Sequence, residues 1–137
     1  MAASPLAVKL KLKAGQRAAL IGAPAGYLQE LSPLPEGVQL SDHLDGKYEW
    51  LQVFVKTESE LVAMLPPLLA ALQPESLLWL SFPKGSSKVQ TDLTRDKGWD
   101  SLRQADLKWI NLVSVNPTWS AFSLRPYRPG EPRQSFR

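Results

Sequence analysis

The chain has 137 residues, the length of one domain, and its 44% hydrophobic and 21% charged residues are ordinary values for a globular protein. It has no cysteine and one histidine, His43, which excludes disulfides, thiolate catalysis, cysteine-based metal sites and any site that needs two imidazoles from one chain. The net charge of +3 comes from the ends, because Lys9–Arg17 and the segment from Arg125 on are basic whereas residues 18–83 are acidic. Nucleic acid is therefore an unfavoured partner.

The first segment, Val8–Lys13, alternates apolar residues and lysines. The alternation fits a β-strand, but its position at the start of the chain leaves the assignment open. The lysines interrupt the apolar core that a signal peptide needs, and the longest apolar run is far below the ~18–20 residues that span a bilayer. We expect a cytoplasmic protein without membrane contact.

Three nearly continuous apolar runs follow, Arg17–Gly22, Trp50–Val55 and Leu77–Phe82, with a short candidate strand at Gly37–Leu40. Strands that are buried on both faces have nearly continuous apolar sequences, whereas strands with one exposed face alternate apolar and polar residues. Each run is followed by a helical or loop segment. The pattern predicts an α/β fold with a central parallel sheet.

Helical segments are predicted between the runs. Tyr27, Leu28 and Leu31 have helical spacing, and Thr57–Glu60 has the form of a capping box that opens a second helix. Pro66 and Pro67 are expected to interrupt or kink that helix, because proline lacks an amide and clashes with the preceding turn. The segment Gln73–Ser76 is expected to turn into the third apolar run.

The last third of the chain predicts an antiparallel hairpin at an edge of the sheet. Trp109–Val115 and Ser120–Leu124 alternate apolar and small polar residues around the turn composition Asn116–Thr118. A short helix over Arg95–Gln104 precedes it, with Trp99 and Leu102 facing inward. We therefore expect one α/β domain over residues 1–124, and a basic, proline-rich, disordered tail over 125–137. The tail is either solvated or a weak electrostatic contact for nucleic acid or an acidic partner.

A parallel βαβ core closed by an antiparallel hairpin resembles the Rossmann-like methyltransferase fold in a reduced form. A second resemblance is carried by five segments, which are Gly22–Gly26, Phe54–Lys56, Leu78–Ser87, Thr91–Arg95 and Trp119–Ala121. With these segments, most of the chain resembles a family of small bacterial proteins described as a domain of unknown function. The resemblance implies fold and kinship, and it implies no activity or cofactor.

Two segments are candidates for binding a ligand beyond the carboxyl ends of the strands, where open α/β sheets bind ligands. Gly22–Gly26 follows the run at residues 17–22, and Lys56–Ser59 follows the run at residues 50–55. If these two strands are neighbours in the sheet, the two segments lie side by side. The Gly22–Gly26 segment is either a ligand loop, with Gly22 and Gly26 letting the backbone approach, or a tight strand-to-helix turn. Its G-x-x-x-G spacing is not a dinucleotide fingerprint.

The second candidate is Lys84–Lys88, whose ammonium groups and hydroxyls suit an anion. Its members are Lys84, Gly85, Ser86, Ser87 and Lys88, and Arg95 can close over the same crevice through two-point contacts. The alternative is a solvated loop that caps the next helix. No metal site is expected.

Asp42 and His43 follow the short second strand. In a methyltransferase-like fold an acid at that point would hydrogen-bond the ribose hydroxyls of a nucleotide. His43 is either a general base or a surface residue. Trp119, at the hairpin turn, is either an exposed stacking residue or a cover for the core, and we favour the cover.

Three hypotheses of function follow. The first is a binding module for a small anionic or nucleotide-like ligand in a crevice formed by Gly22–Gly26 and Lys84–Lys88, with the question of catalysis left open. The second is an S-adenosylmethionine-dependent methyltransferase-like protein, against which the altered glycine loop and the loss of one βα unit between Leu40 and Trp50 count. The third is a protein-interaction module that uses the hairpin edge, with an unidentified partner.

Overall fold

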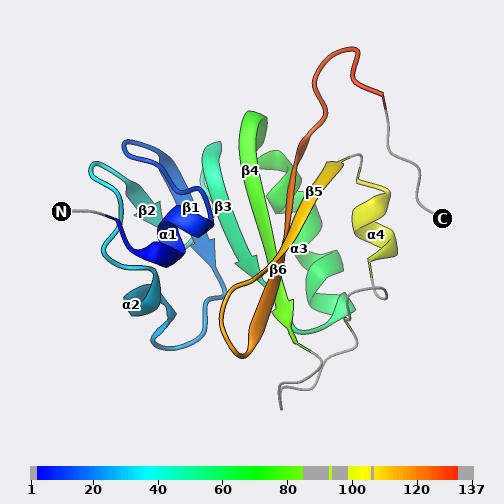
Figure 1. The fold of residues 1–137 in the computed structure, drawn as a ribbon. Helices are drawn as coiled ribbons and strands as arrows, with labels where there is room; N and C mark the ends of the chain where they lie inside the picture. The colour runs from blue at the N-terminus through cyan, green and yellow to red at the C-terminus, as the bar shows by residue number, and fades with distance from the viewer. Residues whose placement is uncertain (1–2, 85–92, 94–98, 106, 133–137) are drawn as a thin grey trace.

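The computed structural model describes residues 3–84, 93, 99–105 and 107–132, and these form a six-stranded sheet with helices on both faces (Figure 1). The predicted fold class, a reduced Rossmann-like α/β sheet closed by an antiparallel hairpin, is confirmed. In spatial order the strands are β2 (Gln39–Ser41), β1 (Arg17–Ile21), β3 (Tyr48–Phe54), β4 (Leu72–Pro83), β6 (Trp119–Pro126) and β5 (Leu107–Ser114).

The first four strands in this order are parallel, and β6 and β5 pair antiparallel to close one side. The chain passes from β1 to its neighbour β2 and then returns to the other side of β1 to form β3. The strand order therefore reverses between β1 and β3, which is where open α/β sheets bind ligands.

The predicted turn at Gln73–Ser76 is a bulge inside β4. The register with β3 shifts from Tyr48 opposite Leu72 to Trp50 opposite Leu77. The Ser76 hydroxyl accepts from the Gln73 amide at 2.8 Å and donates to the Tyr48 carbonyl at 2.5 Å. A side chain thus replaces the backbone pairing that the bulge removes.

One face of the sheet is covered by two short helices, α1 (Pro5–Lys9) and α2 (Tyr27–Leu31). The segment that alternates at Val8–Lys13 thus begins inside a helix. Ser4 caps α1 by accepting from the Ala7 amide, and Pro5 occupies the first turn, where its missing N–H costs nothing. Local start signals therefore override the strand-like alternation.

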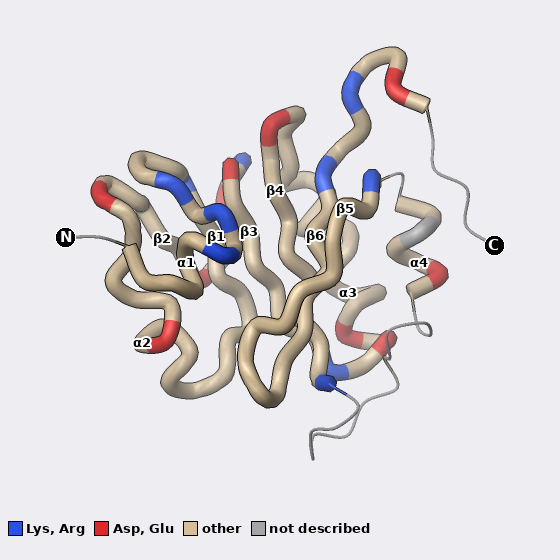
Figure 2. Tube along the Cα trace, in the orientation of Figure 1, with Lys and Arg blue, Asp and Glu red and all other residues tan. Residues whose placement is uncertain are grey.

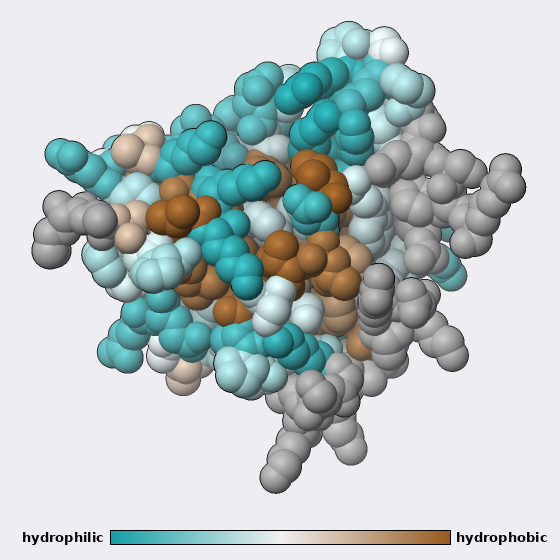
Figure 3. All heavy atoms as spheres, in the orientation of Figure 1, coloured by the Kyte–Doolittle hydropathy of each residue, from teal (hydrophilic) through white to brown (hydrophobic). Residues whose placement is uncertain are grey.

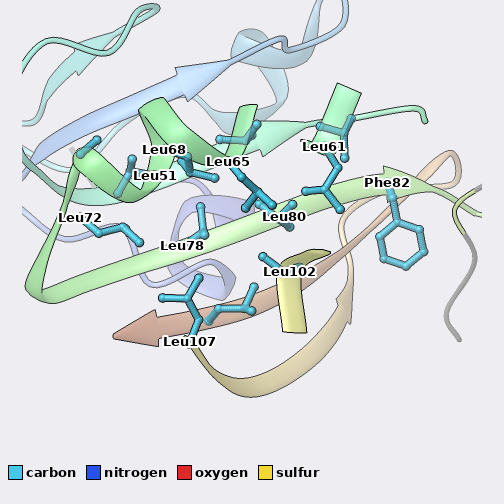
Figure 4. Close-up of a cluster of buried hydrophobic side chains, with 14 of the residues drawn as sticks. Leu51, Leu61, Leu65, Leu68, Leu72, Leu78, Leu80, Phe82, Leu102 and Leu107 are labelled. Atoms are coloured by element: carbon cyan, nitrogen blue, oxygen red, sulfur yellow. The ribbon is translucent and has the colours of Figure 1, made fainter. Parts of the chain in front are cut away.

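The other face is covered by α3 (Glu58–Ala70) and α4 (Asp100–Arg103). Leu61, Leu65 and Leu68 of α3 point at leucines of β3 and β4, such as Leu78 and Leu80 (Figure 4). Trp99 and Leu102 at α4 are buried in the same cluster, as predicted. Within the described ranges, no helix is long and apolar enough to cross a membrane.

Pro66 and Pro67 were predicted to interrupt or kink the helix, and the interruption does not occur, because α3 continues through both prolines to Ala70. Each proline lacks the N–H that would bond to the carbonyl four residues earlier, at Val62 and Ala63. All four of these residues are exposed, so water can reach the carbonyls that lose a donor.

The hairpin lies at the edge of the sheet, as predicted, and Asn116 forms its turn by accepting from the amides of Thr118 and Trp119, both at 2.9 Å. Trp119 is buried, so it covers the core and is not a stacking residue for a partner. β6 includes Arg125 and Pro126, so the domain extends past the boundary at residue 124. The Glu131 carboxylate then pairs with Arg125 at 2.7 Å and Lys108 at 2.8 Å.

Candidate ligand-binding site

The turn after β1 lies at the point where the strand order reverses. Gly22 has φ +71°, and a Cβ built on it would be 3.0 Å from the Phe54 carbonyl oxygen of β3. Only glycine combines this backbone conformation with such a close approach. Because β1 and β3 are neighbours, Gly22–Gly26 and the loop from Lys56 follow adjacent strands, as expected.

A hollow opens beside this turn, between β1, α2 and the end of β2. Its volume of about 430 Å³ falls within the roughly 300–1,000 Å³ range of small-molecule sites. One part of its lining is apolar and consists of Leu20, Leu28 and Leu40; the other is polar and consists of Ser41, Asp42 and His43. A ligand with one apolar face and one hydroxyl-rich edge would suit this division.

Asp42 and His43 form the polar side of the hollow. His43 Nδ1 lies 3.1 Å from Asp42 Oδ1, and the side chains of His43 and Asp42 are largely exposed, at 75% and 96% respectively. The hydrogen bond and charge of the imidazole hold the pKa of the Asp42 carboxyl below its usual value. Asp42 is therefore a carboxylate at neutral pH, with oxygen lone pairs available to accept hydrogen bonds.

The loop that carries these two residues is held by side chains from β2 and β3. The Tyr48 hydroxyl accepts from the Asp45 amide at 2.9 Å and donates to the His43 carbonyl at 3.0 Å. The Ser41 hydroxyl also donates to the His43 carbonyl, at 2.8 Å. The loop thus has fixed partners rather than only solvent.

Arg17, at the start of β1, secures the other end of the same loop. Its guanidinium donates to the carbonyls of Asp45 and Lys47, and it lies 4.1 Å from the centre of the Tyr48 ring. Gly46 lies between Asp45 and Lys47 in the chain and has φ +84°. Because it has no Cβ, it leaves room for the Arg17 guanidinium. Residues 42–47 connect β2 directly to β3, and these contacts give that short connection a defined shape.

A buried polar chain fixes α2, which forms one wall of the hollow. The Tyr27 hydroxyl donates to Gln52 Oε1 at 2.9 Å, and Gln52 Nε2 donates to the Ser81 hydroxyl at 3.1 Å. All three residues are buried, and burial raises the pKa of the Tyr27 phenol. The phenol is therefore neutral and acts as a donor, joining α2 to β3 and β4.

The structure does not bring the two predicted binding segments onto neighbouring strands. Lys84 follows β4, which β3 separates from β1 and its Gly22 turn. Lys84 is instead directed at the hairpin, where its ammonium donates to Ser114 Oγ at 2.5 Å and its amide to the Thr118 carbonyl. Gly85, Ser86, Ser87, Lys88 and Arg95 lie outside the described residues.

The apolar side of the hollow was missed by sequence reasoning. Leu20 belongs to a run that has the sequence of a buried strand, and Leu40 is the middle residue of a strand of only three residues. Leu28 was noted only for its helical spacing with Tyr27 and Leu31, and the structure shows that it is 47% exposed. Among the described residues, no three His, Asp or Glu side chains gather closely enough to hold a metal ion.

Solved structures with a similar fold include several methyltransferases. DhpI in complex with SAH (S-adenosylhomocysteine) matches with a TM-score of 0.61 and 10% identity, over 89% of this chain and 83% of that one. A ribosomal protein L11 methylase from Lactobacillus delbrueckii subsp. bulgaricus matches with a TM-score of 0.50 and 13% identity, over 82% of this chain and 71% of that one. An O-methyltransferase family 2 protein from Planctomyces limnophilus, in complex with apigenin, matches with a TM-score of 0.56 and 7% identity, over 83% of this chain and 50% of that one.

No protein-family model matches the chain, and no curated protein matches it by sequence. At these identities the structural likeness concerns the fold alone. The chain has a methyltransferase-like fold in which residues 42–47 connect β2 directly to β3.

Proposed function

We propose that this protein binds an adenosyl ligand of the S-adenosylmethionine or S-adenosylhomocysteine type in the hollow beside β1 and β2. The observation that carries the proposal is the exposed Asp42 carboxylate at the end of β2, directly beside a wall of three leucines. An acid at this point of a doubly wound sheet is positioned to accept hydrogen bonds from ribose hydroxyls. The leucines suit the flat apolar faces of an adenine ring.

The register of the strands supports this assignment. Ala19 pairs with Ser41, so Asp42 comes one residue beyond the last β1–β2 pair, at the level of Leu20. The turn Gly22–Gly26 joins Leu20 to Leu28, two of the leucines that line the hollow. The part of the ligand beyond the ribose would thus pass the Gly22 turn. The fold of the SAH-bound structure DhpI is consistent with such a ligand.

Methyl transfer is a second candidate and rests on the same ligand. It needs an acceptor substrate and a group that removes its proton. His43 is the only histidine in the chain, and its Nδ1 lies against Asp42. This arrangement would leave Nε2 as a base directed away from Asp42. Binding and transfer are separable, because an adenosyl ligand can bind without an acceptor.

Isothermal titration calorimetry with S-adenosylhomocysteine, S-adenosylmethionine and adenosine tests the binding proposal. We expect all three to bind, and Asp42→Asn to weaken binding about 10- to 100-fold, because hydrogen bonds to a charged group contribute about 1.5–3 kcal/mol. Asp45→Asn is the matched control, since Asp45 is an exposed acid of the same loop that does not line the hollow.

Absence of heat and of any thermal shift with all three compounds at millimolar concentration would refute the proposal. Binding that Asp42→Asn and Asp45→Asn weaken equally would also refute the site. Production of S-adenosylhomocysteine from S-adenosylmethionine, with an added extract of small molecules as acceptors, tests methyl transfer, and its loss in His43→Ala tests the base.

A further inference from the structure

The side chains that line the proposed ligand hollow divide into a polar side and an apolar side. The polar side consists of the consecutive residues Ser41, Asp42 and His43, and the apolar side consists of Leu20, Leu28 and Leu40. The side chain of leucine has neither a hydrogen-bond donor nor an acceptor. Among the described residues, side-chain hydrogen bonds to a ligand are therefore confined to the polar side.

The other uncharged polar side chains of the elements around the hollow are directed elsewhere. In α2, the Tyr27 hydroxyl donates to Gln52 Oε1 at 2.9 Å, inside the core. In β2, the Ser41 hydroxyl uses its single proton for the His43 carbonyl, at 2.8 Å. The two glutamines of α2 and β2 are exposed and are not among the residues that line the hollow; they are Gln29 and Gln39. Asp42 and the His43 ring are thus the polar groups left for a ligand.

The charged side chains of the same elements are also engaged outside the hollow. β1, α2 and β2 are fully described and carry few charges (Figure 2), and their charged residues are Arg17 and Glu30. Arg17 donates to the carbonyls of Asp45 and Lys47. Glu30 Oε1 accepts from Asn116 Nδ2 at 3.1 Å. The carboxylate at the end of β2 is therefore the charged anchor of the hollow.

This division has a consequence for a bound nucleoside. The polar atoms of a purine lie along the rim of the ring, and burying them without hydrogen-bond partners costs free energy. They have no side-chain partner against the leucines, so they must face the water at the opening of the hollow. Leu28, which is 47% exposed, shows that the leucine side reaches the surface. The flat faces of the ring then contact the leucines, whichever polar atoms the rim carries.

We propose that the hollow selects its ligand by the two hydroxyls of the ribose and not by the base, so that purine ribonucleosides bind as a class, adenosyl compounds among them. This selectivity rests on the proposed function, because it requires a nucleoside whose ribose lies at Asp42. A site that hydrogen-bonds a hydroxyl strongly rejects the analogue that lacks it, whereas an apolar surface discriminates weakly between rings of one shape. The selectivity is therefore strong at the ribose and weak at the base.

Isothermal titration calorimetry with four nucleosides measures both selectivities. The four are adenosine, inosine, 2′-deoxyadenosine and 3′-deoxyadenosine. Inosine has a carbonyl in place of the adenine amine and a donor in place of the N1 acceptor, but the faces of its ring are of the same size. We expect inosine to bind within about threefold of adenosine. Each deoxynucleoside should bind at least about tenfold more weakly, because it loses a hydrogen bond to a charged group.

Variants on each side of the hollow separate the two contributions. Asp42→Asn should lower the preference for adenosine over 2′-deoxyadenosine at least about threefold, whereas Asp45→Asn, in the same loop, should keep it. Leu28→Ala should weaken adenosine and inosine by the same factor, since it removes contact with the face of the ring only.

Val8→Ala is the control for adsorption of a ring to any exposed apolar side chain. Val8 is 64% exposed on the face that carries α1, where apolar side chains lie among hydrophilic ones (Figure 3). It does not line the hollow, so its replacement should change none of the four affinities.

Three results would overturn the ribose-based selectivity while leaving the proposed ligand site in place. The first is inosine that loses as much affinity as the deoxynucleosides, which would show that backbone groups of the hollow recognise the base. The second is a deoxynucleoside that binds as tightly as adenosine, and the third is a Leu28→Ala change that weakens adenosine but not inosine. If none of the four nucleosides binds at millimolar concentration, the proposed function fails together with this selectivity.

Discussion

The carbonyl of Leu10 accepts two indole N–H groups, and this arrangement gives a quantitative prediction. Trp50 Nε1 lies 2.8 Å from the Leu10 oxygen and Trp79 Nε1 lies 2.7 Å from it, and all three residues are buried. The two bonds join the end of α1 to β3 and β4. Without them, the segment after α1 would present a buried carbonyl with no donor.

The perturbation is a double-mutant cycle with Trp50→Phe and Trp79→Phe. Each single change removes a hydrogen bond, about 1 kcal/mol net, and part of a buried ring, about 1–2 kcal/mol more, so we expect a loss of about 2–3 kcal/mol. The Leu10 carbonyl keeps one donor in each single variant. In the double variant it loses both, and the loss should exceed the sum of the single losses by about 1 kcal/mol.

Urea denaturation followed by far-ultraviolet circular dichroism at 25 °C measures all four unfolding free energies. This probe does not depend on the tryptophans that are replaced. Losses that add to within about 0.3 kcal/mol would show that the two indoles act independently and that the shared carbonyl is not the coupling group. A double variant whose loss of unfolding free energy is smaller than the sum of the two single losses would refute the reasoning more strongly.

The remaining predictions concern the turn at Gly22–Gly26, the loop over residues 42–47 and the ion pairs of Glu131. Gly22→Ala should lower the unfolding free energy by about 2–3 kcal/mol and Gly26→Ala by about 1 kcal/mol. Both residues have positive φ, but only Gly22 approaches a backbone oxygen, that of Phe54. Equal losses of stability in thermal melts would contradict this reasoning. Tyr48→Phe should cost about 1–2 kcal/mol in urea melts and speed hydrogen exchange at the Asp45 amide, and unchanged exchange would show that the hydroxyl does not hold the loop. Two cations and a backbone N–H hold the pKa of Glu131 well below its usual 4.5, so the stability it adds is fully present above pH 4.5 and declines as the pH falls below it. The difference in urea midpoint between the original protein and Glu131→Gln should shrink from pH 7 to pH 3, and a constant difference would exclude the ion pairs as its source.

The sheet was largely predictable because its central strands are buried on both faces. The runs at 17–22, 50–55 and 77–82 correspond to β1, β3 and β4, and the alternating pair in the last third forms the edge hairpin. Hydrophobic patterning determines such elements almost alone. The βα pattern predicted that a site would lie beyond the carboxyl ends of the strands, but the pairing of β1 with β3 was only assumed as a condition and comes from the structure.

The site was only partly predictable because it depends on contacts between distant residues. Asp42 was identified from its place after a short strand, but its leucine neighbours come from β1, α2 and β2. Lys84 was expected beside Gly22, yet an intervening strand separates them and Ser114 attracts its ammonium. Such pairings depend on the order of strands in space, which local composition does not encode.

Two helices differ from what the local sequence patterns indicated. At α1, the alternation of Val8–Lys13 left the assignment open, and the Ser4 cap together with the indole bonds to Leu10 favours a helix. At α3, the prolines were expected to interrupt or kink the helix, but their exposed position and the burial of Leu61, Leu65 and Leu68 let it continue. Tertiary packing thus adds to a local cap at α1 and outweighs local propensity at α3.

The most direct test of the proposed ligand site is a nuclear magnetic resonance titration of methyl-labelled protein with S-adenosylhomocysteine. The proposed site predicts that the methyl signals of Leu20, Leu28 and Leu40 shift together and saturate, because these side chains line the hollow beside Asp42. The signals of Leu61, Leu65 and Leu68, which lie on the other face of the sheet, should stay in place. Absence of any shift at millimolar ligand, or saturable shifts that spare the three hollow-lining leucines, would contradict the assignment of this site.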